Sequence, residues 1–214
     1  MNPESTTDKR PRSSPGAPAW DLYWAELGPC EHHLQIYEDD DGLLHALEAF
    51  VAAGLRDREG VVVIATEPHR AALRTRLERL GLDLSVLAAH NVYMAIDADE
   101  TLARFMVNGT EGLVPDEKKF QATVSELFRQ AAGVAEGQPL SAGRPVRAFG
   151  EMVALLLARG QTRATVRLEH FWQQLCRREA VSVFCAYPSD GFNKSDASSI
   201  KEICGSHTRL LHYS

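Results

Sequence analysis

The apolar run Val-Val-Val-Ile-Ala at positions 61–65 constrains the fold of this chain more than any other stretch. Its continuous β-branched character is typical of a strand that is buried on both faces of a parallel sheet. Thr66-Glu67-Pro68 follows directly and predicts a helix over 69–80, because proline fits the first turn of a helix and Gly81 can end it. The pattern therefore predicts a strand–helix unit of an α/β domain.

The same alternation of strands and helices recurs along the chain. Strands are expected at 32–37, 61–65, 91–96, 146–149 and 181–186. Helices are expected at 43–55, 69–80, 116–132, 152–158, 162–178 and 199–211, and a further helix opens at the acidic residues 97–100. Strands that alternate with helices form parallel sheets covered on both faces. The expected fold class is therefore α/β, with a three-layer parallel sheet.

The length of 214 residues suits one α/β domain with a sizeable core. Positions 1–19 are rich in Pro, Ser, Thr and charge, so we expect a disordered tail there and a single domain over 20–214. The net charge of -6 argues against nucleic-acid binding, because phosphate contacts depend on Lys and Arg. The longest apolar run, 152–158, is too short to span a bilayer, so neither a nucleic acid nor a membrane is expected as a partner.

The cysteines favour a reducing compartment. Cys30, Cys176, Cys185 and Cys204 form no C-x-x-C pair and have no zinc-knuckle spacing. The N-terminus has no apolar segment of the secretory type. We therefore expect a cytoplasmic protein with reduced thiols and no cofactor.

The carboxyl ends of the predicted strands gather acids and aromatic rings. In open parallel sheets, ligands bind at this edge. The residues there are Tyr37, Glu38, Glu67, Asp97, Glu151 and Tyr187. A nucleotide site would need a Gly-rich turn and a Lys instead, yet the first strand leads into Glu-Asp-Asp-Asp-Gly. The chain also contains neither of the phosphate-binding motifs G-x-x-x-x-G-K-(S/T) and G-x-G-x-x-G. No functional ATPase is therefore expected.

Each of these residues also has a structural interpretation. Glu151 is as readily a cap or an ion-pair partner as a ligand contact, and Glu67 suits the N-terminus of its helix. Tyr37 and Tyr187 are of a type that more often packs half-buried. Glu169 lies one position from the apolar stripe of its helix, and a carboxylate that points inward needs a partner.

Two adjacent histidines, His32 and His33, lie on the first strand, so their side chains point to opposite faces. A metal site of His33, Cys185 and His207 is conceivable, because imidazole and thiolate suit zinc or iron. No ligand spacing supports it, and a hydrogen-bonded histidine with a small apolar cysteine is the simpler interpretation. No metal is therefore expected, and His33 and Cys185 remain candidate ligand contacts.

The chain resembles the MEDS domain, a sensory domain named from methanogen and methylotroph regulators, over about residues 30–212. The likeness rests on an ordered set of segments: His-His-Leu-Gln-Ile-Tyr-Glu-Asp at 32–39, Gly-Val-Val-Val-Ile-Ala-Thr at 60–66, Gly-Glu-Met at 150–152, Leu-Glu at 168–169 with Trp172, Phe-Cys-Ala-Tyr at 184–187, and His207. The resemblance implies a KaiC/RecA-like ATPase fold that has lost its phosphate loop. It puts Glu67 near the place of the catalytic glutamate, and 145–151 at the Walker B strand.

The resemblance also implies a sensor of small organic molecules that works beside DNA-binding, PAS or histidine-kinase modules. This chain shows no such output module, so we expect it to signal through a partner, such as a histidine kinase or regulator, or by self-association. The leading hypothesis is a non-enzymatic protein that binds a small organic ligand or a protein partner at the carboxyl edge. It would thereby regulate transcription or a two-component pathway.

Two alternatives remain open. The first is an enzyme, in which Glu67 and Glu151 would do acid–base chemistry if they were close, or a metal would be held by His and Cys. Nucleophilic catalysis has little support, because a thiolate is disfavoured in a buried strand and no G-x-S-x-G elbow occurs. The second alternative is a pure protein-interaction module without a ligand.

Overall fold

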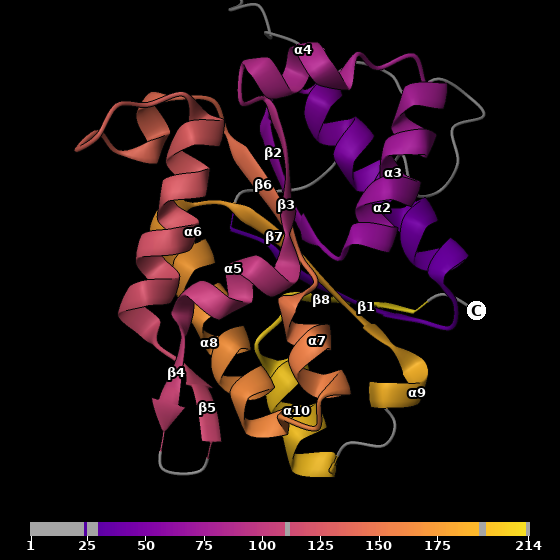
Figure 1. Cartoon of the computed structure of the whole chain (residues 1–214), viewed down its shortest axis with the longest axis vertical. Helices are drawn as coiled ribbons and strands as arrows, with labels where there is room; N and C mark the ends of the chain where they lie inside the picture. The colour runs from indigo at the N-terminus through magenta and orange to yellow at the C-terminus, as the bar shows by residue number, and fades with distance from the viewer. Residues whose placement is uncertain (1–23, 25–29, 110–111, 193–195, 213–214) are drawn as a thin grey trace, which may run out of the picture.

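The computed structural model describes residues 24, 30–109, 112–192 and 196–212, so the predicted tail at 1–19 lies outside the described residues. Six strands form one all-parallel sheet in the order β3-β2-β6-β7-β1-β8, with helices on both faces (Figure 1). These strands are β1 (His32–Tyr37), β2 (Gly60–Ala65), β3 (Tyr93–Asp97), β6 (Val146–Gly150), β7 (Ser182–Pro188) and β8 (Arg209–His212). The expected three-layer α/β fold is confirmed.

Two groups of helices cover the two faces of the sheet (Figure 1). One group comprises α2 (Asp40–Arg56), α3 (Glu67–Arg79) and α4 (Leu84–Ala89). The other comprises α5 (Ala98–Phe105), α6 (Glu117–Ala132), α7 (Met152–Ala158), α8 (Thr162–Glu179) and α10 (Ala197–Gly205). Side chains alternate along each strand, so Leu34 and Cys185 enter the core under α8, whereas Phe184 enters the core under α2. Because of this alternation, only strand residues that point to the same face of the sheet can contact one another.

Acidic residues at the strand ends start the helices, as their positions predict. Asp39 accepts a hydrogen bond from the Gly42 N–H at the start of α2, and Asp97 accepts one from the Glu100 N–H at the start of α5. Asp116 does the same for α6. Several strand-to-helix turns are thus fixed by carboxylates, which brings negative charge to the carboxyl edge of the sheet.

The prediction of one helix over 199–211 was wrong. Helix α10 ends at Gly205, and the chain then enters the edge strand β8. Hydrogen bonds to the backbone of β1 cause the change: Thr208 N donates to His32 O at 2.7 Å, and His32 N donates to the side-chain Oγ1 of Thr208 at 2.9 Å. His207 therefore lies in the turn between α10 and β8 rather than inside a helix.

Smaller elements also escaped prediction. They are α4, the hairpin of β4 (Met106–Gly109) and β5 (Gly112–Pro115), the short η1 (Leu140–Ala142), and α9 (Ser189–Phe192).

Among the described residues, no helix combines the length and the apolar character that crossing a membrane requires.

Candidate functional site

Glu151 is the centre of a first polar network, at the carboxyl edge of the sheet. It follows β6 and is only 6% exposed. Its carboxylate accepts hydrogen bonds from the backbone N–H of Thr66 at 2.8 Å and from Thr66 Oγ1 at 3.2 Å, and it lies 2.8 Å from His69 Nδ1. Thr66 joins β2 to α3, so Glu151 ties together the turns that follow two neighbouring strands.

His69 lies between two carboxylates. Its Nδ1 bonds Glu151, and its Nε2 is 3.4 Å from Asp40 Oδ1. The hydrogen bond with Glu151 raises the pKa of His69, although partial burial opposes this shift. Asp40, at the start of α2, is exposed. We call Thr66, His69, Glu151 and Asp40 the edge network; it presents a protonatable imidazole and an exposed carboxylate to solvent.

Tyr37 ends β1 on the same edge and is buried. Burial raises the pKa of Tyr37, and the nearby charges of Glu151 and Asp40 add to the shift. Its phenol is therefore neutral at physiological pH and lies beside the edge network.

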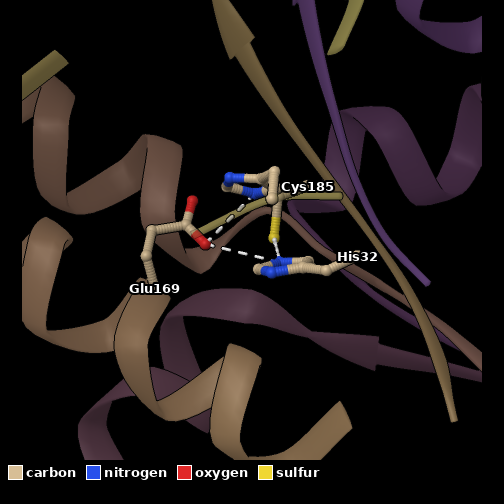
Figure 2. A group of neighbouring side chains, drawn as sticks. His32, Glu169 and Cys185 are labelled. Atoms are coloured by element: carbon tan, nitrogen blue, oxygen red, sulfur yellow. Dashed lines mark hydrogen bonds and ion pairs between the residues drawn. The ribbon is translucent and has the colours of Figure 1, made fainter. Parts of the chain in front are cut away.

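A second polar network lies inside the molecule, between the sheet and α8 (Figure 2). It consists of His32, Glu169, Cys185 and His207, whose ligand-type atoms all lie within 4.8 Å of one another. His32 Nε2 is 3.4 Å from Cys185 Sγ and 3.5 Å from Glu169 Oε2, and His207 Nε2 is 3.4 Å from Glu169 Oε2. All four side chains are almost completely buried. We call these residues the inner cluster.

Four segments that are distant in sequence build the inner cluster. Strands β1 and β7 are parallel neighbours, and Leu34 pairs with Cys185, so His32 and Cys185 face the same core. Helix α8 crosses that face and turns Glu169 inward. The turn after α10 places the His207 ring on the His32 ring, with centroids 3.9 Å apart. The cluster thus joins β7 and β1 to the turn that leads into the edge strand β8.

Burial dominates the electrostatics of the inner cluster. It lowers the pKa of His32 and raises the pKa values of Glu169, Cys185 and Tyr187. The hydroxyl of Tyr187 donates a hydrogen bond to Glu169 Oε1. Each shift favours the uncharged form, as expected where charged groups leave water without a compensating ion.

The family model of the methanogen/methylotroph DcmR sensory domain, MEDS, matches residues 31–208. The chain belongs to the MEDS family. No curated protein shows significant similarity to it. The match confirms the resemblance drawn from the sequence, and it gives this MEDS domain a sensory or signalling role.

Two solved structures from Pyrococcus horikoshii OT3 are similar to this MEDS domain. The protein PH0250 has 14% identity and a TM-score of 0.56, over 91% of this chain and 87% of that chain. The KaiC-like protein PH0186 has 11% identity and a TM-score of 0.54, over 87% of this chain and 74% of that chain. At these identities the likeness shows the fold alone, and the fold is KaiC-like.

The predicted site residues of the MEDS domain fall into two separate places. Tyr37 and Glu151 lie at the carboxyl edge, whereas Glu169, Cys185 and Tyr187 meet at the inner cluster. Tyr187 was expected at the edge with Glu151, but its side chain points to the α8 face, where Glu169 takes its hydroxyl. The edge and the inner cluster are therefore two sites rather than one.

His33 joins neither place, which corrects its pairing with Cys185. Its side chain is on the α2 face, where its ring packs edge-on against Trp24 and its Nε2 is 3.1 Å from Glu31 Oε2. Burial there lowers the pKa of His33 to about 3. The alternation of side chains selects His32 for the inner cluster instead.

Glu67 is the other candidate that the structure places differently. It is the first residue of α3, its side chain is 65% exposed, and it pairs with Arg70 at 2.7 Å. His69, two positions further on, lies beside Glu151 instead. The sequence signal for His69 was its place in the first turn after β2, at the same edge as Glu151.

Two hollows on the surface coincide with neither network. One, of about 360 Å³, is lined by residues 112–114 and 160–164. The other, of about 340 Å³, lies beside β3 and includes Arg70, Arg74 and Tyr93.

Proposed function

We propose that this MEDS domain is a non-enzymatic sensory protein that recognises a small organic ligand at the carboxyl edge of its sheet and signals to a partner protein. The observation that carries the proposal is the acidic turn after β1, where a nucleotide site would need backbone N–H groups of a Gly-rich turn. Residues 38–41 read Glu-Asp-Asp-Asp, and Asp40 faces the imidazole of His69. A protein partner that docks at the same edge is the second form of this proposal.

The chemistry of this edge favours one class of ligand. A phosphate-binding turn offers backbone N–H groups and a lysine to an anion. Here the exposed carboxylates of Asp40 and Asp41 would repel a phosphate and would attract a positive charge or hydrogen-bond donors. A small organic molecule with an amine or hydroxyl group therefore fits the edge better than a nucleotide does.

The bonding of the edge network argues against nucleophilic catalysis by the Thr66 hydroxyl. In nucleophilic catalysis the base accepts the proton of the nucleophile directly. Thr66 Oγ1 and His69 Nδ1 instead both bond the same carboxylate, Glu151. The Thr66 hydroxyl thus bonds Glu151 rather than a base that would activate it, and Glu151 ties the turn after β6 to the turn after β2.

Thermal-shift measurements and calorimetry test this proposal. We expect small amines or alcohols to stabilise the wild-type protein, and magnesium with ATP to leave it unchanged. Asp40→Asn and His69→Gln should each abolish the ligand-induced shift. His45→Gln provides the matched control, because His45 is exposed on α2.

Two results would overturn the ligand form of the proposal. Tight magnesium-dependent ATP binding would show that the edge still accepts a nucleotide. A ligand-induced shift that survives both Asp40→Asn and His69→Gln would place the ligand elsewhere. If the small-molecule screen yields nothing while a regulator or kinase binds wild type and not the two variants, the partner form stands.

A further inference from the structure

We propose that His32, Glu169, Cys185 and His207 are the ligands of a structural transition-metal ion, for which zinc is the best fit. The site goes beyond the proposed sensory function and lies on the α8 face, apart from the edge network. Two imidazoles, a thiol and a carboxylate are the donor types that zinc binds in proteins. Calcium and magnesium prefer oxygen ligands throughout.

The spacing of the donor atoms suits a tetrahedral ion. Zinc binds nitrogen, oxygen and sulfur at about 2.0–2.3 Å, so the ligand atoms of a tetrahedral site lie about 3.3–3.8 Å apart. Three of the six separations between the donor atoms fall in or near this range: 3.4 Å from His32 to Cys185, 3.5 Å from His32 to Glu169, and 3.4 Å from His207 to Glu169; the other three are within 4.8 Å. The ligands are therefore already in place around a common centre.

The outer atoms of the same side chains are held as metal ligands usually are. His32 Nδ1 lies 3.0 Å from the carbonyl of Ser206, and His207 Nδ1 lies 2.6 Å from the carbonyl of Ile203. A carbonyl only accepts, so each Nδ1 carries the proton and each Nε2 turns a lone pair inward. Tyr187 binds the outer oxygen of Glu169 and leaves the inner one facing the cluster. Backbone carbonyls and hydrogen-bond donors orient metal ligands in this way.

Two of the inner atoms, by contrast, lack hydrogen bonds. Glu169 Oε2 and His207 Nε2 are buried and have no hydrogen-bond partner among the described residues. With both Nδ1 atoms protonated, the inner atoms of His32, His207 and Glu169 are all acceptors, and within the cluster the Cys185 thiol is the one remaining donor. Buried polar atoms without partners are costly and rare. A single cation at the centre would satisfy all of them at once.

The charges balance when the ion is divalent. On binding, the Cys185 thiol loses its proton to solvent, and the thiolate forms the bond to the metal. Thiolate and the Glu169 carboxylate supply two negative charges, and the imidazoles stay neutral. Four protein ligands close the coordination shell, which is the arrangement of a structural site. The ion would tie β1, β7, α8 and the turn after α10 together.

Metal content and cobalt substitution test the site in the full chain. The protein is expressed without a histidine tag in zinc-supplemented medium, dialysed and measured by plasma emission spectrometry. We expect about one zinc ion per chain. After removal of the metal with a chelator, cobalt(II) should bind with a thiolate charge-transfer band and the strong visible bands of tetrahedral cobalt.

Paired variants locate the ion. Cys185→Ser should lose the charge-transfer band and most of the zinc, whereas Cys204→Ser, in the neighbouring α10, should keep both. His32→Gln should lose zinc, whereas His33→Gln, one residue along the same strand, should keep it. Tyr187→Phe removes only the hydrogen bond to Glu169 and should weaken zinc affinity about 10- to 100-fold.

The wild-type protein decides the matter even if a ligand variant does not fold. Wild type that retains no zinc, iron or copper and binds no cobalt after metal removal would overturn the proposal. So would a loss of zinc in Cys204→Ser or His33→Gln equal to that in the ligand variants, provided circular dichroism shows these controls folded. Either result leaves the edge network and its ligand screen untouched.

Discussion

Replacing Glu151 by glutamine probes the edge network most directly. Glutamine has nearly the shape of glutamate but no charge, and it offers one acceptor oxygen instead of two. In the wild-type protein the two oxygens take the backbone N–H of Thr66 and the Nδ1 of His69, each at 2.8 Å. In the variant, one of these donors faces the amide NH₂ and loses its acceptor.

The cost follows from the two bonds. A hydrogen bond to a charged group contributes about 1.5–3 kcal/mol, and a neutral one about 0.5–1.5 kcal/mol. One bond is lost, at about 1.5–3 kcal/mol, and the other loses its charge, at about 1–1.5 kcal/mol, so Glu151→Gln should lower the free energy of unfolding by about 2.5–4.5 kcal/mol while His69 is protonated. For a chain of this length each kcal/mol corresponds to about 2–4 °C, so Tm should fall by about 5–18 °C.

The loss should depend on pH because His69 titrates. The hydrogen bond with Glu151 raises the pKa of His69 above its ordinary value of 6.5 in the folded protein. The stabilisation from this pair is therefore fully present below the unfolded-state pKa, and it is lost as the pH rises through the folded-state pKa. Removal of the carboxylate removes this dependence, so the difference between wild type and variant should shrink at alkaline pH.

Urea denaturation of wild type, Glu151→Gln, His69→Gln and the double variant measures these quantities. The measurements are made at about pH 6 and about pH 9, on either side of the expected titration. The coupling energy between the two positions should be larger at the lower pH. His45→Gln, on the exposed side of α2, is the control for the loss of an imidazole. Equal losses at both pH values, or additive single variants, would refute the coupling of His69 to Glu151.

Three further changes test other features of the fold. Gly60→Ala should lower the free energy of unfolding in urea by at least about 1–3 kcal/mol, because the new Cβ would lie 2.3 Å from the carbonyl oxygen of Ala131. Gly205→Ala should be neutral or stabilising, because its new Cβ would have no atom within 4 Å. Arg147→Ala should cost about 3–5 kcal/mol, because Arg147 is 2% exposed and its removal leaves the partly buried Glu59 without its cation. Glu67→Ala should cost less than about 1 kcal/mol and leave ligand shifts unchanged, because Glu67 is 65% exposed and Arg70 keeps its ion pair with Asp97.

Local patterns predicted most of the main sheet. The apolar run of β2, and the strands β1, β6 and β7, were located within two residues of their ends. Helix starts were predictable where an acid caps them, as Asp97 caps α5 and Asp116 caps α6. The exception was β8, because its identity as a strand depends on backbone bonds to β1, which is more than 170 residues away in sequence. No local pattern contains that pairing.

The candidate sites show the same division between local and distant causes. The sequence indicated that only one of His32 and His33 faces a given site, since alternation along a strand is local. It did not indicate which one, because the answer depends on the register of β1 against β7 and on the position of α8. Likewise, the pairing of Glu151 with His69 depends on how α3 leaves β2. Residue types and faces were predictable, but partners across the sheet were not.

The edge network and the inner cluster differ in how completely their hydrogen bonds are satisfied, and this difference suggests different roles for them. Both oxygens of Glu151 have protein donors, so this part of the edge network is stable by itself, and the exposed Asp40 beside it remains open to an exchangeable ligand. The inner cluster has buried atoms without hydrogen bonds and no exposed ligand atom, so an ion there would exchange only when the surrounding core opens. A ligand can shift a conformational equilibrium only by its differential affinity for two states, and it must exchange to report a change in its concentration. Under the two proposals, the edge therefore suits a reversible signal, and the inner cluster suits an ion that would stay bound and hold the sheet together.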